Sequence, residues 1–537
     1  MKLGIVYTGG TIGCFYRPLR PMTSEEFAAL FDQHAMPIIA AKYPQLRMQH
    51  IPFGSALDST NIQPMDWCKI VETILSAYMT CDCFLVLHGT DTMAYTASAL
   101  SFLFTGVDTN GHRDCIINKP IIVTGSQLPL FDGENPKAGA QIRFNSDAFQ
   151  NICGAVTCAH YGIPKVCLFF NNKLFLGTRA QKTSSNQFDA FSSPNYPPLA
   201  QVGIEATLNH GSVKLHFPSK EKLLTNPLAR ERLQAQLDYI SSLGNEKIRV
   251  STFEAYPANS KHLAGQLRNI LHLDNPEKQL HGLILEAYGA GNFPSGNPAE
   301  PTKGEVYQVL AEATAKGVII VNNTRCLSGI VDSSAYEAGS WMASVRAVSA
   351  YDLTPVALYT KLLFMLSLAH RYNWSGDTIR TLLAGNYAGE MLDVHCLDTF
   401  GQRELWPGES ITSLDGTARL TNDWYRGPIL RLRQNGNWSE PVWSAMDSSR
   451  DVGLTCILRM QSDGNLVFRN HTLECLWESG TAKDAREEPY SRLELTGLTH
   501  PEGASLQIYN YVSHVVTKRL FPVEDDTGTG AKRVSRD

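Results

Sequence analysis

The chain has 537 residues, of which 43% are hydrophobic and 18% are charged. At about 150 residues per domain, this length predicts three or four globular domains with hydrophobic cores. The formal net charge is −5, which is weak for this length and gives no electrostatic reason to expect nucleic acid or an anionic membrane as a partner.

The twelve cysteines do not follow a metal-binding or disulfide pattern. Cys81 and Cys83 are two positions apart, and no CxxC pair accompanies a second pair or a series of histidines. We therefore predict neither a zinc site nor a disulfide framework. The apolar start leads into Thr-Gly-Gly-Thr without a small-residue cleavage site, which indicates a first β-strand and not a signal peptide. No apolar stretch reaches the roughly 18 residues that span a bilayer, so we predict a cytoplasmic protein with free thiols.

Short continuous apolar runs recur through the first 390 residues. They alternate with segments whose apolar residues recur at helical spacing, such as Met65–Tyr78 and Ala94–Phe104. Continuous runs are typical of parallel strands that are covered on both faces. The alternation therefore predicts an α/β fold with parallel sheets. The predicted strands are Leu3–Tyr7, Cys83–Leu87, Ile121–Thr124, Lys165–Phe170, Gly282–Ala287 and Val318–Asn322.

Two changes of composition predict the domain boundaries. Clusters of Ser, Asn and Pro lie between about residues 184 and 222, and helical periodicity stops after Asp393, where Asp-Gly and Asn-Gly turns begin to separate short strands. We expect two α/β domains with an all-β domain after them, joined by a linker or edge region and followed by a polar, disordered tail. The predicted ranges are 1–200 and 245–392 for the α/β domains, 201–244 for the linker or edge region, 397–522 for the all-β domain and 523–537 for the tail.

A glycine-rich turn, Tyr7-Thr8-Gly9-Gly10-Thr11-Ile12-Gly13, follows the first predicted strand. Glycines let the backbone turn sharply and approach a ligand closely, so Thr11 is a candidate for an exposed reactive hydroxyl. A phosphate-binding turn is the alternative, but the spacing matches neither GxxxxGK[ST] nor GxGxxG. By itself this segment leaves both interpretations open.

A second polar segment, His88-Gly89-Thr90-Asp91-Thr92, lies between a predicted strand and a predicted helix. Ligands of doubly wound sheets bind at such carboxyl ends of strands, where Asp91 suits a substrate ammonium and Thr90 offers a hydroxyl. Both residue types also cap helices, so that role stays open. Lys182 is either a solvated surface group or, if it lies buried near a hydroxyl, a group for proton transfer.

These two segments resemble the two signatures of the bacterial-type L-asparaginase family, and the remainder is similar to its cytoplasmic type I branch. The resemblance runs in order over about residues 3–392. Stretches that support it are Asp58-Ser59-Thr60, Ala94–Phe102, Val123–Leu130, Leu168–Asn172, Phe188–Asn195 and Ala287–Asn292.

The resemblance implies a role for each matching residue. Thr11 matches the nucleophilic threonine that forms an acyl-enzyme, and Thr90, Asp91 and Lys182 match the set that activates the nucleophile or water and binds the substrate. The segment that holds the α-carboxylate and the α-amine matches Asp58, Ser59 and Thr60. The implied reaction is hydrolysis of L-asparagine to L-aspartate and ammonia, without a metal or an organic cofactor, in a homodimer or homotetramer. Splitting a difficult amide hydrolysis into two easier steps is the physical reason for such an intermediate.

Two positions depart from the family pattern. The family carries a tyrosine two residues before a proline on the loop after the nucleophile, whereas here Leu19 and Arg20 precede Pro21, and Tyr16 is the substitute that the loop offers. This change keeps a related amidase or glutaminase, acting on another amide, as an alternative. Tyr16 can equally serve only to pack the loop.

The second departure concerns an allosteric asparagine site of some type I members. That site uses an arginine in the segment matching Glu286, Ala287 and Tyr288, together with residues matching Thr324 and Cys326. Here the arginine position holds Glu286. An acidic side chain repels a substrate carboxylate, so we predict that the site is vestigial.

The all-β part resembles the bulb-type (mannose-binding) lectin domain, which predicts a β-prism-like fold. The sugar motif Q-x-D-x-N-x-V-x-Y is matched by Gln461, Asp463, Asn465 and Val467, but Arg469 replaces the tyrosine. The motif is either a carbohydrate site or a hairpin turn built on Asp463-Gly464. A carbohydrate or protein partner for this domain therefore stays open, as does a protein that senses an amino acid and binds a glycan or partner.

Overall fold

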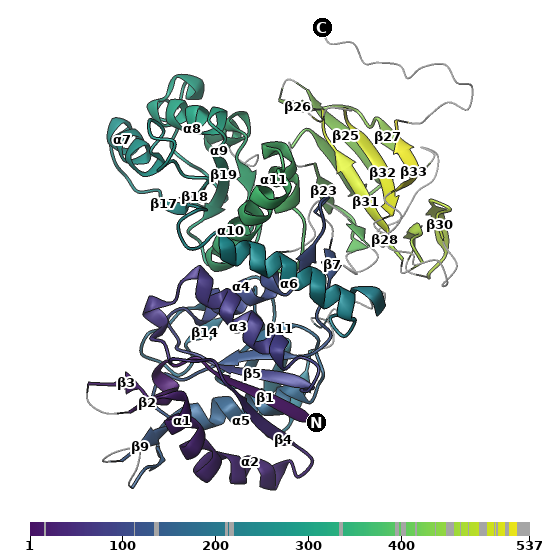
Figure 1. The fold of residues 1–537 in the computed structure, drawn as a ribbon. Helices are drawn as coiled ribbons and strands as arrows, with labels where there is room; N and C mark the ends of the chain where they lie inside the picture. Colours follow the sequence, from purple (N-terminus) through teal and green to yellow (C-terminus); the bar gives the residue numbers. More distant parts are fainter. Residues whose placement is uncertain are drawn as a thin grey trace. The chain divides into compact units, whose positions relative to one another are not determined.

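The protein is described here from a computed structural model, in which two compact units follow one another along the chain: Met1–Met391 and Leu392–Asp537 (Figure 1). The structure describes residues 1–15, 18–111, 113–133, 139–209, 213, 220–331 and 337–391 of the first unit. In the second unit it describes residues 397–398, 404–413, 416–434, 436–446, 456–461, 463–470, 472–482, 491–498, 500, 503–510 and 515–522. The predicted tail, 523–537, therefore lies outside the described residues.

The first unit begins with an eight-stranded sheet of mixed direction. Five strands run parallel in the order β11-β8-β5-β1-β4, and three more extend the sheet beyond β11, each antiparallel to its neighbour. The prediction of a purely parallel sheet is therefore wrong for this domain, although the predicted strands fall where expected. The parallel strands are β1 (Lys2–Tyr7), β4 (Arg47–Ile51), β5 (Cys83–Leu87), β8 (Ile121–Thr124) and β11 (Val166–Phe170); the others are β12 (Lys173–Leu176), β15 (Ala200–Val202) and β16 (Ala206–Leu208).

The order of the parallel strands creates a switch point beside β1. Strand β4 pairs with one edge of β1, and the chain then crosses back to form β5 on the other edge. The loops that follow β1 and β5 therefore leave the sheet at the place where ligands bind in doubly wound folds. Thr11 and Thr90 lie on these two loops.

Helices cover both faces of this sheet. Helices α1 (Ser24–Leu30), α2 (Met36–Lys42) and α5 (Ala148–Ala159) contribute to one core with alternate residues of the strands, as the twofold strand period requires. Helices α3 (Pro64–Ser76) and α4 (Met93–Leu103) lie outside this core; α3 contacts β1, and α4 contacts β8 and β11. Nearly all of α4 is buried, because it also packs against helix α10 (Pro355–Tyr372), which belongs to the second lobe described next.

The second lobe of this unit is built on a four-stranded parallel sheet in the order β17-β18-β19-β20. Its buried strands include the predicted runs that begin at Gly282 and near Val318, and helices α7 and α8 form a separate core cluster with strands of this sheet. The strands are β17 (Val250–Glu254), β18 (Gly282–Ala287), β19 (Ile319–Thr324) and β20 (Val348–Ser349), and the helices are α7 (Ser260–Leu271), α8 (Glu305–Ala315), α9 (Glu337–Ser340), α10 (Pro355–Tyr372) and α11 (Gly376–Leu383).

The segment 201–244, expected as a linker or edge region, contains regular structure. Strand β16 lies at the edge of the first sheet, and helix α6 (Pro227–Ser242) packs against α3 and α10. Asn226 caps this helix by accepting a hydrogen bond from the N–H of Leu228, and Pro227 fits the first helical position because it needs no donor there.

Short two-stranded pairs project from the loops of the first domain. Two of them flank the site described below: β2 with β3 after the glycine-rich turn, and β13 with β14 around Lys182. These pairs are β2 (Cys14–Phe15) with β3 (Arg20–Pro21), β6 (Gly106–Val107) with β7 (Arg113–Cys115), β9 (Phe131–Asp132) with β10 (Gln141–Ile142), and β13 (Gln181–Lys182) with β14 (Phe191–Ser192).

Two fully buried ion pairs connect parts of the first unit that are far apart in sequence. Arg179, near the end of the first domain, is bonded to Asp352 of the second lobe at 2.5 Å and donates to the carbonyl of Gly389 at 2.7 Å. Lys361 of α10 lies 2.8 Å from Glu390. Such charges are stable inside a protein only when they are paired and hydrogen-bonded.

Replacing Lys361 by methionine is expected to lower the free energy of unfolding of the first unit by about 3–5 kcal/mol, because it leaves the Glu390 carboxylate buried without its counter-charge. Urea denaturation followed by circular dichroism measures this loss. The double variant Lys361→Met/Glu390→Gln should recover a large part of it. Equal stability of the single and double variants would contradict this electrostatic explanation.

The described residues of the second unit are all-β, as predicted, and form three antiparallel sheets that share a core (Figure 1). The first sheet contains β22 (Glu404–Leu405), β28 (Ile457–Met460), β29 (Leu466–Arg469) and β30 (Cys475–Glu478); the second contains β23 (Ser410–Thr412), β24 (Ala418–Asp423), β25 (Gly427–Gln434), β26 (Asn437–Trp438) and β27 (Trp443–Ser444); the third contains β21 (Leu397–Asp398), β31 (Ser491–Thr496), β32 (Ser505–Asn510) and β33 (Val515–Phe521). Within the described part of the chain, no helix is both long and apolar enough to cross a bilayer.

Candidate active site

The glycine-rich turn brings the backbone after β1 against a neighbouring loop. Gly9 and Gly10 have φ values of 110° and 81°, and Gly9 forms a parallel bridge with Leu57. A Cβ atom on Gly9 would lie 2.1 Å from the carbonyl oxygen of Leu57. Glycine is therefore required here both by the positive φ and by the close approach. The 3₁₀ turn that follows begins with Thr11, whose side chain is partly exposed.

The two sequence motifs are in direct contact through their glycines. A Cβ atom on Gly10 would lie 2.2 Å from Cα and N of Gly89, and one on Gly89 would lie 2.4 Å from the hydroxyl oxygen of Ser59. Three loops therefore meet at one point, and each carries predicted site residues next to the contact. Thr11 follows Gly10, and Thr90 follows Gly89, so the structure brings these two hydroxyl residues into one neighbourhood.

Lys182 lies on strand β13 and reaches the second motif. Its Nζ donates to Oγ1 of Thr90 at 2.9 Å and to Oδ1 of Asp91 at 2.8 Å. The side chain of Lys182 is 21% exposed and that of Asp91 is 55% exposed. Lys182 is thus hydrogen-bonded to both Thr90 and Asp91, and the Asp91 side chain is open to solvent.

Gln127, at the end of the loop after β8, completes this cluster and had no role predicted from the sequence. Its side-chain oxygen accepts the hydroxyl hydrogen of Thr90 at 3.2 Å, and the buried carboxylate of Asp147 accepts the backbone N–H of Gln127. Because the Thr90 hydroxyl donates to Gln127, its lone pairs are available to Lys182. The position of Gln127, directly after the strand beside β5, was the signal available in the sequence.

The segment Asp58, Ser59 and Thr60 forms a short 3₁₀ turn beside the cluster. The Asp58 carboxylate accepts the backbone N–H of Thr60 at 3.1 Å, and the hydroxyl of Thr92 donates to the carbonyl of Ser59 at 2.7 Å. The second motif therefore holds this turn in place. The proposed α-amine and α-carboxylate ligands lie next to the hydroxyl and lysine cluster, as the resemblance implies.

His88 connects the second motif to the interior. Its Nδ1 lies 2.7 Å from the carbonyl oxygen of Gly89, and its Nε2 lies 2.9 Å from the hydroxyl of Thr96, which in turn accepts the indole N–H of Trp67 at 3.1 Å. A carbonyl only accepts, so Nδ1 carries the proton and Nε2 accepts from Thr96. Burial lowers the pKa of His88 to about 4, which keeps this imidazole neutral at physiological pH.

This buried neutral imidazole predicts a pH dependence of stability. The unfolded state binds a proton at His88 below its ordinary pKa of about 6.5, whereas the folded state does so only near pH 4. Above about pH 6.5, His88 should therefore leave the free energy of unfolding unchanged. As the pH falls to about 4, it should lower that free energy by an amount approaching roughly 3 kcal/mol. Urea denaturation at a series of pH values measures the slope. We expect a shallower slope for His88→Asn, and equal slopes would contradict the assignment.

Cys14 directly follows the glycine-rich turn and carries a thiol. It is buried, and its Sγ lies 3.4 Å from the carbonyl oxygen of Gly10. Burial raises the pKa of Cys14 to about 11, with a further contribution from Asp58. The thiol is therefore protonated at neutral pH, and thiolate chemistry is disfavoured at this position.

The remaining predicted residues lie elsewhere. Tyr16 lies outside the described residues; it belongs to the connection between β2 and β3, on which Leu19 is exposed. The residues of the vestigial allosteric site, Glu286, Ala287, Tyr288, Thr324 and Cys326, follow or end strands β18 and β19 of the second lobe. The residues of the sugar motif lie in the second unit.

The polar groups at the vestigial allosteric positions are bonded to each other. The Glu286 carboxylate accepts two hydrogen bonds from the Asn323 amide at 3.1 Å, and Thr324 donates to the carbonyl of Gly289 at 2.6 Å while accepting the N–H of Cys326. Burial raises the pKa of Glu286, and the nearby Glu254 adds to this shift. This acidic surrounding is unsuited to a ligand carboxylate.

The asparagine of the sugar motif is used by the fold of the second unit. Asn465 is buried; its amide oxygen accepts from the hydroxyl of Ser479 and from the N–H of Thr481, and its amide nitrogen donates to Glu478 at 2.7 Å. Asp463 accepts the backbone N–H of Asn465 at 2.9 Å. A sugar at this motif would have to displace these bonds, whereas Gln461 remains partly exposed beside them.

The first unit is thus the catalytic unit of an α/β enzyme, with hydroxyl, lysine and carboxylate groups gathered at the carboxyl ends of parallel strands. A family model described as "Asparaginase, N-terminal" matches residues 2–214, and one described as "Glutaminase/Asparaginase C-terminal domain" matches residues 249–382. The chain belongs to the asparaginase family and is an amidohydrolase. The matched regions end within the first unit.

Individual relatives cover the same part of the chain. L-asparaginase 1 of Escherichia coli (strain K12) is 32% identical over 393 residues, which make up 72% of this chain and 97% of that protein. The 60 kDa lysophospholipase of Mus musculus is 31% identical over 412 residues, covering 73% of this chain and 62% of that protein. The crystal structure of L-asparaginase I from Vibrio cholerae matches with a TM-score of 0.54 and 33% identity, over 73% of this chain and 98% of that one.

Proposed function

We propose that the chain is an L-asparaginase that converts L-asparagine to L-aspartate and ammonia through an acyl-enzyme on Thr11. The observation that carries the proposal is the bonded set of Thr90, Asp91 and Lys182 beside the loop of Thr11. The membership of the asparaginase family supports it, as do the E. coli and Vibrio cholerae relatives, whose names refer to L-asparagine.

In the first step the Thr11 oxygen bonds to the side-chain amide carbon of the substrate. The hydroxyl proton passes by way of Thr90 to the nitrogen of Lys182. The C–N bond then breaks, and the departing nitrogen takes that proton from Lys182 and leaves as ammonia. In the second step water attacks the aspartyl ester and passes a proton to Lys182. Lys182 returns it to the Thr11 oxygen as the ester C–O bond breaks, and L-aspartate leaves. A positioned base makes each proton transfer concerted with bond formation.

The peptide between Gly89 and Thr90 is oriented for stabilising negative charge on the carbonyl oxygen of the substrate. His88 donates to the Gly89 carbonyl, and the N–H of a trans peptide points away from the carbonyl of the same peptide. The Thr90 N–H is therefore directed away from the buried imidazole. A fixed backbone donor at that point fits an oxyanion hole, a type of contact whose loss costs about 10²–10³-fold in kcat.

Substrate selection in this proposal rests on the carboxylates of Asp58 and Asp91 and on the turn at Ser59. Both carboxylates are at the site, and either can receive the α-ammonium of an amino acid, while the backbone of the turn faces the α-carboxylate. The departure at Leu19 bears on which amide is preferred, because that residue lies on the loop after the nucleophile. Glutamine is the alternative substrate that the same site chemistry accepts.

The test is release of ammonia from a panel of substrates by the full chain. The panel contains L-asparagine, L-glutamine and an amide that lacks the α-carboxylate. A lysophospholipid is added, and assayed by release of fatty acid, because the mouse relative is named for that substrate. We expect the highest kcat/KM for L-asparagine. A higher kcat/KM for any other compound, with asparagine turned over only at background rate, would overturn the assignment of substrate.

Further parts of the proposal concern the setting of the enzyme. The described cysteines are free thiols, which supports a cytoplasmic location. The resemblance to the type I branch supports a homodimer or homotetramer. For the second unit we propose a lectin-like, β-prism-like domain with a carbohydrate or protein partner, supported by its three sheets around one core. The bonds that occupy Asn465 favour a scaffold or contact role over sugar binding at that motif.

A further inference from the structure

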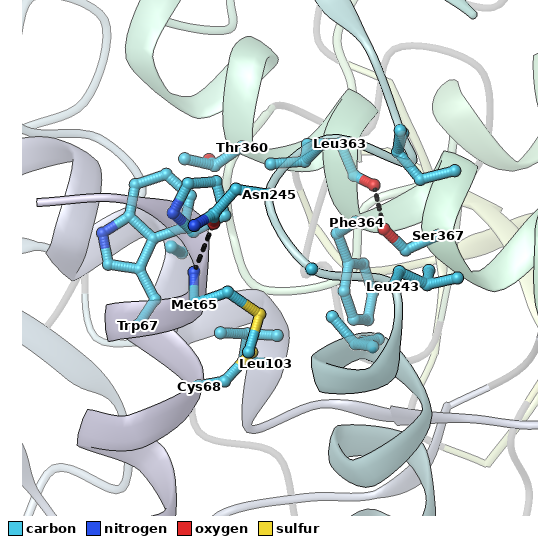
Figure 2. Close-up of a pocket in the computed structure, with 15 residues that line it drawn as sticks. Met65, Trp67, Cys68, Leu103, Leu243, Asn245, Thr360, Leu363, Phe364 and Ser367 are labelled. Carbon is cyan, nitrogen blue, oxygen red and sulfur yellow. Dashed lines mark hydrogen bonds between the residues drawn. The ribbon is translucent and has the colours of Figure 1, made fainter. Parts of the chain in front are cut away.

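A pocket lies between helices α3, α4, α6 and α10 of the first unit, away from the cluster around Lys182. Its cavity volume is about 40 Å³, and the open depression around it, solvent space included, is about 540 Å³. Figure 2 shows Trp67 and Cys68 of α3 and Leu103 of α4 on one side, with Leu363 and Phe364 of α10 opposite them. The pocket is thus formed jointly by the first domain and the second lobe, a common location for ligand sites.

The lining of this pocket carries no charge. None of its fifteen residues, all of them described, is acidic or basic. Burial raises the pKa of Cys68 to about 11, so its thiol is also neutral at pH 7. Several polar groups are already bonded: the Thr360 hydroxyl to Ser98 at 2.7 Å, the Ser367 hydroxyl to the carbonyl of Leu363 at 2.8 Å, and the Asn245 amide to the N–H of Met65 at 3.1 Å.

These properties select the chemistry of a ligand. An amino acid or a phosphate would have to bury its charge without a partner, at a large cost in free energy. Aliphatic side chains outnumber the two aromatic ones in the lining, and the dispersion contacts that they offer have no directional requirement. The best fit is an uncharged alkyl chain.

The pocket is connected to the catalytic loop by the hydrogen bonds of Trp67. Its ring lines the pocket, and its indole N–H donates to the hydroxyl of Thr96. That hydroxyl is bonded to His88, which is bonded in turn to the carbonyl of Gly89. Gly89 precedes Thr90, whose N–H orientation depends on that same peptide. A ligand that moves the Trp67 ring therefore acts on a chain of hydrogen bonds that ends at the Gly89 carbonyl, next to Thr90.

We propose that this pocket binds a small uncharged molecule with an alkyl chain, and that its occupancy alters ligand binding at the catalytic cluster through Trp67, Thr96 and His88. The coupling rests on the proposed function, because it needs L-asparagine or L-aspartate as the ligand of that cluster. By thermodynamic linkage the effect is reciprocal: L-aspartate changes the affinity for the alkyl ligand by the same factor as the alkyl ligand changes the affinity for L-aspartate.

The first arm of the test measures binding alone. Isothermal titration calorimetry with n-hexanol, n-heptanol and n-octanol should show one saturable site, with the affinity rising about fourfold for each added methylene. Leu243→Trp, in the lining of the pocket directly after α6, should abolish this site, whereas Leu228→Trp, exposed on α6, should keep it. A thermal melt of each variant confirms folding. Absence of saturable binding to the wild type, or equal binding to a folded Leu243→Trp, would overturn the site.

The second arm measures coupling with the same preparation. Saturating L-aspartate should change the Kd of n-octanol by about fivefold or more in the wild type. Thr96→Val should bind n-octanol within about twofold of the wild type but lose the effect of L-aspartate, while Thr105→Val, just beyond the end of α4, should keep both. An effect of L-aspartate that persists in Thr96→Val would overturn the route through His88.

Ammonia release, measured on the same samples, separates the two hypotheses. If the protein hydrolyses L-asparagine but L-aspartate leaves the Kd of n-octanol unchanged, the coupling is wrong and the proposed function stands. If it does not hydrolyse L-asparagine, the proposed function and the coupling built on it both fail, and the calorimetric comparison of Leu243→Trp with Leu228→Trp still decides whether the pocket is a binding site.

Discussion

Thr11→Ala is expected to lower kcat for L-asparagine by at least about 10⁴-fold, because residues that act as one catalytic unit lose nearly all function when the nucleophile is removed. Alanine lacks the oxygen that would bond to the amide carbon, and the nearby Cys14 thiol cannot replace it because burial raises its pKa to about 11. Steady-state release of ammonia measures the loss. The fold should not change, because Thr11 is partly exposed at the start of a 3₁₀ turn.

Two further variants make this result specific. Thr11→Ser keeps the hydroxyl and should retain a measurable part of the activity. Thr207→Ala, on the edge strand β16, removes a threonine far from the loops that meet at Gly89 and should behave as wild type. Retention of wild-type kcat by a folded Thr11→Ala variant would rule out a covalent intermediate on this residue.

Lys182→Met is expected to lower kcat by about 10²–10⁴-fold, the range that a positioned proton-transfer group supplies. Methionine keeps most of the length and the apolar stem, but it removes the Nζ that bonds Thr90 and Asp91 at 2.9 and 2.8 Å. The KM should change less than kcat, because the Lys182 side chain acts mainly in proton transfer and less in substrate binding. Ammonia release over a range of asparagine concentrations separates the two parameters.

Lys173→Met is the matched control, since it removes a lysine that is paired with Asp189 at 3.0 Å on a more exposed surface. That variant should keep the wild-type kcat. If Lys182→Met raised only the KM and left kcat unchanged, Lys182 would be a binding residue and not part of the proton route.

Much of the first unit follows from the pattern of apolar runs. Strands β5, β8 and β18 begin and end where the sequence predicts, because each is a continuous apolar run covered on both faces. Continuous runs carry this signal because burial on two faces leaves no polar position. The short strands β15 and β16 are half exposed at the sheet edge, so their sequence lacks such a run and their antiparallel addition was missed.

Helix α6 illustrates a signal that was present but outweighed. Asn226 and Pro227 form a standard helix start, and Leu233 and Leu237 are spaced for one buried face. The Ser-, Asn- and Pro-rich stretch just before it favoured a linker. Local composition was less informative here than the capping residues, because capping reports directly on unpaired backbone donors.

The site was predicted for the residues that motifs identify and missed for those that only tertiary contacts reveal. The loops that carry Thr11 and Thr90 meet because the strand order places β1 beside β5, and Lys182 bonds Thr90 from strand β13. Gln127 bonds Thr90 from the loop after the adjacent strand β8, and its position after that strand, rather than a motif, was its one signal in the sequence. The buried hydrogen bonds that join His88, Thr96 and Trp67 depend on helix packing, so they too are visible only in the three-dimensional structure.

The most direct test of the acyl-enzyme is to stop the reaction with acid during turnover of L-asparagine and to identify the modified residue by peptide mass spectrometry. The proposal predicts an aspartyl ester on Thr11 that disappears when the substrate is exhausted and is absent from Thr11→Ala. An aspartyl adduct on another residue that rises and falls with turnover, with Thr11 unmodified, would contradict it.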